Sequence, residues 1–436
     1  MNSIATAITI TELLAGQPPV WPDDPFAAIR ATVAASATRL VVLDDDPTGT
    51  QTVHDMPVLT TWSVAALAAE LQNQGPGFFV LTNSRSLTTA AAASLSREIG
   101  ANLRCAVDAT GVPVQVISRS DSTLRGHFPA EIDALMQAMG TPDLPRIIAP
   151  CFFEGGRLTA GDVHYVAEND RLVPAAQTPY AQDAAFGYRH SNLRDWVVEK
   201  TGGRVAVDQV ASVTLADLRT GGPKQVSERL VSLPPQSCCI VNALEYRDLE
   251  VFVAGLLAAG QQGRRFVLRS AASLVRVRAG IAPIDLLDRG DVVGNTDTGG
   301  LFVVGSYVPK TTAQVEALIA GSAVQGIEIK VRDLLEDRRR AEAIAGASKA
   351  ASQALSRGRD TVLYTSRNLE KGTDADSSLA IGRRVSKSLI AIVGGIDCQP
   401  RYLVAKGGIT SSDLATRGLG VRRAMIIGQM LPGVPV

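Results

Sequence analysis

A three-part pattern recurs along the chain: a short run of apolar, often β-branched residues, then a polar cluster, commonly with glycine, then a helix-like stretch. In the first half, apolar runs at 39–43, 78–81, 114–117 and 146–149 lead into DDDPTGT, TNSRS, SRSDSTLRG and PCFFEGGRLTAGD. In the second half, the pattern recurs at 301–304, 361–364 and 401–405. Strands that alternate with helices favour a mostly parallel sheet covered on both faces, so we expect an α/β fold.

The segment 280–300 separates the two halves, because it is rich in Gly, Asp and Pro and has no clear hydrophobic period. A chain of 436 residues is long enough for two or three domains of roughly 100 to 200 residues each. We therefore predict two Rossmann-like three-layer domains, residues 1–290 and 291–436, with a ligand cleft between them. Two long helices are expected in the second domain, at 334–356 and 374–393.

Composition excludes several classes of partner. Lys and Arg total 43, as do Asp and Glu, so no global field is available to hold nucleic acid or an anionic membrane. No apolar stretch reaches the roughly 18 residues of a spanning helix, and the N-terminal segment lacks the features of a signal peptide. The five cysteines are scattered and form no CxxC pair. These features favour a cytoplasmic protein without nucleic-acid or membrane partners, and they are compatible with a homodimer.

The polar clusters fall where open α/β sheets bind ligands, outside the carboxyl ends of the strands. In the first cluster, the consecutive carboxylates of Asp44, Asp45 and Asp46 repel one another unless a cation such as Mg²⁺ or a polyol lies among them. A type I turn with a capping Asp46 is the alternative interpretation.

A second cluster, SRSDSTLRG, combines guanidiniums with hydroxyls and one carboxylate. Arg119 and Arg125 can each hold a carboxylate or phosphate in bidentate fashion, and Arg85 in TNSRS adds a third cation. We therefore expect a small, anionic, hydroxyl-rich ligand. Four histidines also lie in or beside the loops of the first half, where structural and catalytic roles both stay open: His54, His127, His164 and His190.

The second half offers a phosphate-binding candidate in KGGITSSD, residues 406–413. Two glycines after a strand let a ligand approach the backbone, and the N–H groups of the following helix favour phosphate. A simple capped turn is the alternative. No Walker loop, GxGxxG, GxSxG or HExxH signature occurs in the chain, so a nucleotide would depend on a loop of this kind.

Taken in order, these motifs resemble those of the four-carbon acid sugar kinases. The matching segments are DDDPTGTQTVHD, TNSRS, SRSDSTLRGHFP, APCFFEGGRLTAGDVHY and AAFGYRHSNL, then VVGSYVPKT and VAKGGITSSD. The resemblance implies that the N-terminal domain binds a sugar acid of the threonate, erythronate or 3-oxo-tetronate type. It also implies that the C-terminal domain binds ATP, accompanied by Mg²⁺, although no metal ligand is assigned.

Site residues follow from the resemblance position by position. The implied sugar-acid contacts are Asp45, Asp46, Arg85, Arg119, Ser120, Asp121, Ser122 and Thr123. The implied ATP contacts are Ser306, Gly407, Gly408, Ile409 and Thr410.

The chain departs from the family pattern in two places. The shorter family members have Lys-Lys-Ile-Asp before Ser-Thr-Leu-Arg-Gly, where this chain has Ser-Arg-Ser-Asp, so we expect a different substrate pocket. Relatives also continue for about forty residues beyond the equivalent of Val436, through a Gly-Asn-x-Gly loop that contacts ATP. The C-terminal domain is therefore expected to lack that contact.

The expected reaction is in-line transfer of a phosphoryl group from ATP to a sugar-acid hydroxyl, catalysed mainly by positioning and charge neutralisation. Arg85, Arg119 and Arg125 would hold the substrate carboxylate or the transferring phosphoryl group. Either Asp45 or Asp121 would accept the hydroxyl proton. Two alternatives remain open, a decayed sensor of sugar acid or nucleotide and a magnesium-dependent sugar-acid lyase.

Overall fold

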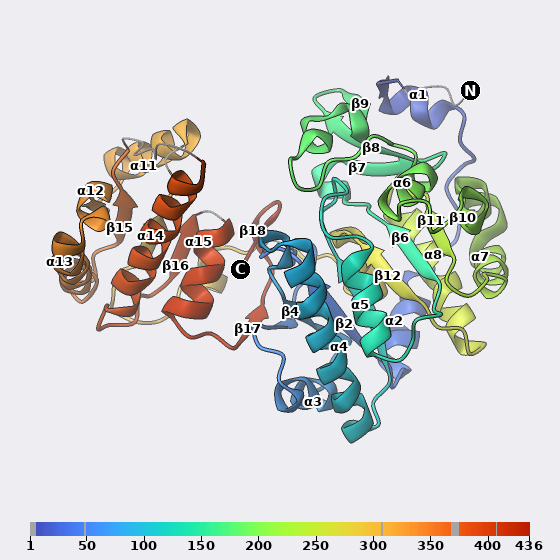
Figure 1. Cartoon of the computed structure of the whole chain (residues 1–436), viewed down its shortest axis with the longest axis horizontal. Helices are drawn as coiled ribbons and strands as arrows, with labels where there is room; N and C mark the ends of the chain where they lie inside the picture. Colours follow the sequence, from blue (N-terminus) through green and yellow to red (C-terminus); the bar gives the residue numbers. More distant parts are fainter. Residues whose placement is uncertain (1–5, 48, 307, 368–374, 407) are drawn as a thin grey trace. The chain divides into compact units, whose positions relative to one another are not determined.

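The chain divides into two compact units. The structure is a computed structural model that describes residues 6–47, 49–306, 308–367, 375–406 and 408–436, apart from the side chains of 375–379 and 408–410. The first unit comprises the chain up to Leu286 together with Arg423–Val436, and the second is Leu287–Arg422 (Figure 1). The division lies close to the expected boundary at residue 290. Residues 423–436, expected in the second domain, pack instead with the first unit.

A nine-stranded sheet forms the centre of the first unit. Its order is β10 (Val210–Val213), β11 (Cys238–Val241), β6 (Arg146–Ala149), β12 (Val267–Ser270), β5 (Val114–Arg119), β2 (Arg39–Asp44), β4 (Gly77–Leu81), β3 (Met56–Leu59) and β17 (Arg423–Ile426). Neighbouring strands are parallel except β17, which pairs antiparallel with β3. The predicted α/β fold with mostly parallel sheets is confirmed.

Helices cover both faces of this sheet, because its central strands are apolar on both sides. Along β2, Leu40 and Val42 face one hydrophobic cluster, whereas Val41 and Leu43 face another. The first cluster contains residues of α2 (Phe26–Ala35), α7 (Gly222–Val231), α8 (Tyr246–Gln261) and α9 (Ala272–Arg278). The second contains residues of α3 (Val64–Gln72), α4 (Thr89–Thr110), α5 (Ala130–Ala138) and α6 (Leu193–Lys200).

A small antiparallel sheet is the main feature that the sequence pattern did not predict. Its order is β1 (Ile8–Thr9), β9 (Arg171–Pro174), β8 (Val163–Glu168) and β7 (Arg157–Ala160), and α1 (Ile10–Ala15) follows β1. The segment EGGRLTAGDVHY, expected as a glycine-containing loop, forms the β7–β8 hairpin. Gly161 and Asp162 at its turn both have positive φ, of 56° and 63°, which is the geometry that two-residue hairpin turns favour.

The second unit is a four-stranded parallel sheet with helices. The strand order is β14 (Gln325–Ile329), β15 (Thr361–Thr365), β13 (Leu301–Val304) and β16 (Leu403–Lys406). The helices are α10 (Arg289–Val292), α11 (Pro309–Gly321), α12 (Val331–Leu335), α13 (Asp337–Leu355), α14 (Ala375–Gly394) and α15 (Gly408–Asp413). Of these, α13 and α14 correspond to the helices expected at 334–356 and 374–393.

The end of the chain returns to the first unit through β17. Strand β3 would otherwise leave one row of backbone groups unpaired, and β17 supplies their partners. The Arg423 guanidinium also pairs with the Glu70 carboxylate, and a hairpin of β18 (Gln429–Leu431) and β19 (Val434–Pro435) follows. Among the described residues, no helix has both the length and the apolar character needed to cross a membrane.

Candidate active site

Loops from four adjacent strands meet at one edge of the large sheet. The strands are β12, β5, β2 and β4, and because they are parallel, their carboxyl ends share that edge. The loop after β2 begins with Asp45 and Asp46, and a 3₁₀ turn after β4, Ser84–Ser86, carries Arg85. The segment 119–125 comprises the last residue of β5 and the loop that follows it. These sequence-distant side chains therefore converge, as the strand-end pattern predicts.

Asp45 lies almost completely buried at the centre of this cluster. Its Oδ1 accepts a hydrogen bond of 2.5 Å from Nη2 of Arg85, and its Oδ2 accepts one of 2.6 Å from the Ser120 hydroxyl. The Arg85 backbone N–H also donates to the Asp45 carbonyl, at 3.2 Å. Both oxygens of the Asp45 carboxylate are thus engaged, and Arg85 is fixed through its backbone as well as its side chain.

Asp121 forms a second anionic centre beside Arg85. Its Oδ2 accepts hydrogen bonds from Nε of Arg125, at 2.8 Å, and from the Thr123 hydroxyl, and its Oδ1 lies 3.7 Å from Nη1 of Arg85. Burial by itself raises the pKa of Asp121, but the Arg125 hydrogen bond and the charges of Arg85 and Arg125 outweigh burial and lower the pKa to about 2. Asp121 is therefore a firmly ionised group and a weak proton acceptor.

Asp44, at the end of β2, is buried against Arg119. Nη1 of Arg119 lies 3.1 Å from Oδ1 of Asp44. Burial raises the pKa of Asp44 to about 7, and the guanidinium opposes that shift. Oδ2 of Asp46 lies 3.4 Å from Nη1 of Arg85. The positive charge that the three consecutive carboxylates require is therefore supplied by guanidinium groups of the chain itself.

The described residues beside these carboxylates form no protein-only metal site. Across the ranges that the structure describes, no three His, Cys, Asp or Glu side chains are grouped so that they could hold a metal ion. A Mg²⁺ ion that arrives with a nucleotide needs only one or two protein carboxylates, because phosphates and water complete its shell. The least buried carboxylate of the aspartate run is that of Asp46, with 25% of its side chain exposed.

Arg269 also contacts this cluster, although the sequence analysis did not identify it as a site residue. Its Nη2 donates to the Ser120 hydroxyl at 3.1 Å, and its guanidinium carbon lies 5.3 Å from the ring centre of Phe128. Burial lowers the pKa of Arg269, whereas the charges of Asp45 and Glu131 raise it. Arg269 is a single arginine in the run VLRSAAS, so no local motif marks it as a site residue. The one available indication was its position near the carboxyl end of the strand that became β12.

Two of the four histidines support the site. His164 bonds through Nε2 to the Ser122 carbonyl at 2.7 Å, and burial lowers its pKa to about 4, so it is a neutral structural residue. Nε2 of His127 lies 3.2 Å from the Ser84 carbonyl. His54 instead contacts Asp55, and His190 lies 3.9 Å from Glu199.

The structure brings together the sugar-acid contacts expected from the sequence. They lie in the two loops after β2 and β4 and in the segment that ends β5. These residues are Asp45, Asp46, Arg85, Arg119, Ser120, Asp121, Ser122 and Thr123. Arg125, expected to hold the substrate carboxylate or the transferring phosphoryl group, lies beside them through its bond to Asp121.

The expected ATP contacts lie at the corresponding edge of the second unit. Ser306 comes two residues after β13, and β13 pairs with β16, after which Gly408, Ile409 and Thr410 begin α15. Gly407 lies outside the described residues, as do the side chains of 408–410. Sequence reasoning missed Arg367, whose Nη1 donates to the Ser306 carbonyl at 2.7 Å and whose Nη2 donates to the Thr365 hydroxyl at 3.0 Å.

Two family models match consecutive parts of the chain. A model described as a sugar-binding N-terminal domain matches residues 40–278, and one described as a nucleotide-binding C-terminal domain matches residues 301–436. The chain belongs to the four-carbon acid sugar kinase family. Members of this family are phosphotransferases with an alcohol group as acceptor, so the expected family and enzyme class are confirmed.

Three curated relatives of this chain are sugar-acid kinases. A D-threonate kinase of Salmonella typhimurium is 27% identical over 333 residues, covering 73% of this chain and 72% of the relative. A D-erythronate kinase of Heliobacterium modesticaldum is 26% identical over 52% of this chain and 47% of the relative. A D-threonate kinase of Bordetella bronchiseptica is 28% identical over 55% of each. The match thus spans about half the length of the last two relatives.

Solved structures share the fold of this kinase-family chain. A Salmonella typhimurium LT2 protein, described as a tRNA synthase, has a TM-score of 0.67 and 17% identity over 91% of this chain and 92% of its own. Haemophilus influenzae protein HI1011 has a TM-score of 0.63 and 17% identity over the same shares. At such identity, the likeness concerns the fold alone.

Proposed function

We propose that this protein is an ATP-dependent kinase that phosphorylates a hydroxyl group of a four-carbon sugar acid of the threonate, erythronate or 3-oxo-tetronate type. The observation that carries the proposal is the cluster around Arg85, in which one guanidinium lies near the carboxylates of Asp45, Asp46 and Asp121. Guanidiniums bind a carboxylate, and aspartates accept bonds from sugar hydroxyls, so the cluster offers both kinds of contact that a sugar acid needs.

Burial and charge distinguish the candidate proton acceptors. Asp45 has 5% of its side chain exposed and both oxygens engaged, and the pKa of Asp121 is about 2. Asp46, with 25% exposed, is the more accessible carboxylate. We therefore assign the contact with the reacting hydroxyl to Asp46, and we assign Asp45 to the positioning of Arg85. A loose phosphoryl-transfer transition state makes a modest demand on the base, so a carboxylate can fill that role.

The second unit is proposed to hold ATP through Ser306 and the 407–410 segment. Backbone N–H groups that follow a parallel strand are suited to phosphate oxygens. Mg²⁺ would arrive with the nucleotide and neutralise charge on its phosphates. Arg367 would keep the loop after β13 in place by its bond to the Ser306 carbonyl.

A coupled assay of ADP release tests the proposal. The acceptors are D-threonate, L-threonate, D-erythronate and 3-oxo-tetronate, each with ATP and Mg²⁺, and calorimetry measures binding in parallel. We expect ADP release that depends on one of these acids and falls in Asp46→Asn, but not in Asp108→Asn, which changes an exposed carboxylate on α4. Binding without ADP release would instead support a sensor, and loss of the acid without ATP would support a lyase.

A further inference from the structure

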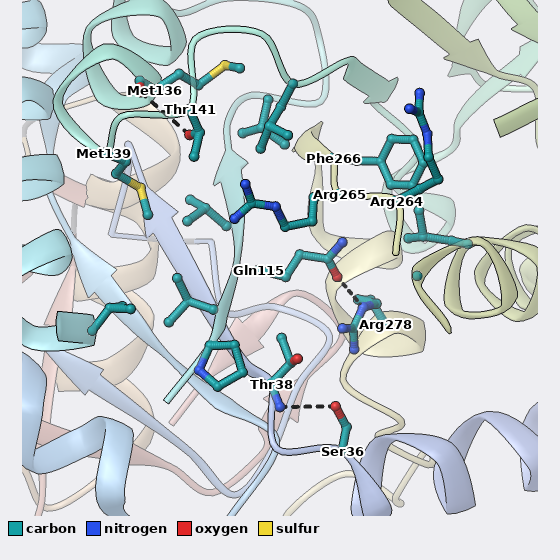
Figure 2. A pocket seen from close by; sticks show the side chains of 18 of the residues that line it. Ser36, Thr38, Gln115, Met136, Met139, Thr141, Arg264, Arg265, Phe266 and Arg278 are labelled. Atoms are coloured by element: carbon teal, nitrogen blue, oxygen red, sulfur yellow. Dashed lines mark hydrogen bonds between the residues drawn. The ribbon is translucent and has the colours of Figure 1, made fainter. Parts of the chain in front are cut away.

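A cavity lies at the edge of the large sheet opposite the candidate active site, where β5 and β12 begin. Its volume is about 520 Å³, within the range typical of small-molecule sites. Figure 2 shows that its lining includes Met136 and Met139 near the end of α5 and Phe266 just before β12. Val107 of α4 and Leu256 of α8 add further apolar surface. The cavity is therefore largely apolar and distinct from the candidate active site.

One buried cation lines this apolar cavity. Arg278, the last residue of α9, is 6% exposed, and its Nε donates to the side-chain oxygen of Gln115 (Figure 2). Within the part of the chain that the structure describes, no carboxylate forms an ion pair with Arg278. Burial lowers its pKa to about 10. A buried guanidinium with only a neutral partner is costly, and an anion bound in the cavity would offset that cost.

The other charged groups of the lining strengthen the positive field. Arg264 and Arg265 lie on the loop before β12, and both line the cavity. Nη2 of Arg264 donates to the Leu233 carbonyl, a neutral acceptor, at 2.6 Å. The lining carboxylate of Asp108 is already 4.0 Å from Nε of Arg104. The cavity thus combines apolar walls with uncompensated positive charge.

We propose that this cavity is a second ligand site, which binds a small organic anion with an apolar body and holds the anionic group at Arg278. The apolar walls would cover the body of the ligand, and Arg264 and Arg265 would attract it to the opening. Because β5 runs from Val114 at this cavity to Arg119 at the candidate active site, the two sites lie at opposite ends of one strand. The largely apolar lining does not suit the hydroxyl groups of a sugar acid, so the ligand of this cavity belongs to another chemical class.

Fluorescence titration of the full chain with 8-anilinonaphthalene-1-sulfonate tests this site, because the probe joins an apolar body to an anion. Arg278→Met removes the charge and retains an apolar side chain, and we expect it to weaken binding at least tenfold. Arg39→Met is the matched control, since Arg39 lines a separate cavity near the same edge. Equal binding by the wild type and Arg278→Met, or weaker binding only in Arg39→Met, would overturn the proposal.

A second variant keeps the test decisive if Arg278→Met does not fold. Gly260 lines the cavity, and a Cβ there would meet no atom within 4 Å, so Gly260→Trp can obstruct the cavity without removing a charge. We expect Gly260→Trp to abolish binding, and Gly346→Trp, at an exposed position of α13, to leave it unchanged. Octanoate should compete with the probe. Competition by inorganic phosphate alone would contradict an apolar-bodied ligand.

Discussion

Arg85 and Asp45 form a 2.5 Å ion pair between the carboxyl ends of two neighbouring parallel strands. The same guanidinium lies 3.4 Å from Asp46 and 3.7 Å from Asp121. A planar guanidinium has five donors in a fixed fork, so it can contact several carboxylates at once. Arg85 is thereby the side chain that connects the loops after β2, β4 and β5.

Replacement of Arg85 by lysine should impair catalysis more than folding. Lysine retains the charge but cannot reproduce the forked contacts with three carboxylates, so kcat/KM for the sugar acid should fall about a hundredfold. Arg97→Lys, on the exposed surface of α4, is the control and should stay near the wild-type value. Steady-state kinetics and urea unfolding of both variants provide the measurement. An Arg85→Lys enzyme within threefold of the wild type would show that the fork is not required.

The low pKa of Asp121 predicts a pH-dependent contribution to stability. Because the folded-state pKa of about 2 lies below the ordinary value of 3.8, the stabilisation is present above about pH 4 and is lost as pH falls toward 2. The shift corresponds to about 2 kcal/mol. Urea unfolding should therefore show Asp121→Asn less stable than the wild type by about this amount near pH 7, with a smaller difference near pH 3.

The control for this experiment is Asp108→Asn, which changes a carboxylate that is 71% exposed. It should differ little from the wild type at either pH, because exposed ion pairs contribute little. The free energy of unfolding of Asp121→Asn could also differ from that of the wild type by the same amount at both pH values. That result would mean that the lost stability comes from packing and not from ionisation.

Gly49 should tolerate no side chain. A Cβ at this position would lie 1.8 Å from Oδ2 of buried Asp44, so Gly49→Ala must displace either the carboxylate or the loop. Such overpacking costs about 2 kcal/mol, which thermal or urea unfolding would detect. Gly16→Ala is the control, since a Cβ there has no atom within 4 Å. Equal stability of Gly49→Ala and Gly16→Ala would show that the loop after β2 adapts freely.

The active-site edge could be predicted from sequence because its signal is local. Asp45, Arg85 and Arg119 each occur at or just after the end of an apolar run, and parallel strands bring such positions to one edge. Arg269 follows the same rule, but no polar cluster surrounds it. Its role depends on contacts with Ser120 and Phe128, which are separated from it by well over a hundred residues in sequence.

Other features depend on long-range pairing that no local pattern encodes. The pairing of β17 with β3 joins segments that lie more than 350 residues apart in the sequence. The β7–β8 hairpin is equally hard to predict, because the glycines and the charged residues of EGGRLTAGDVHY are typical of loops. Arg278 is similar, since its burial at the opposite cavity follows only from the packing of α9 against the sheet.

Arg367 should act as a positioning residue for the nucleotide in the proposed kinase. It bonds to the Ser306 carbonyl and to Thr365, and so it connects the loops that follow β13 and β15. Without these bonds the loop that carries Ser306 is no longer held in position, so Arg367→Met should raise KM for ATP about tenfold. A tenfold change corresponds to the free energy of about one hydrogen bond to a charged group. KM for the sugar acid should not change, because its proposed contacts lie in the other unit.

Three companion measurements make the Arg367 experiment specific. Arg357→Met removes an exposed arginine of the same unit and should leave both KM values unchanged. Arg367→Lys should restore part of the ATP affinity, because lysine can still donate to one carbonyl. Urea unfolding should show similar stability for Arg367→Met and Arg357→Met. If Arg367→Met raised both KM values equally, or left KM for ATP unchanged, Arg367 would not position the nucleotide loop.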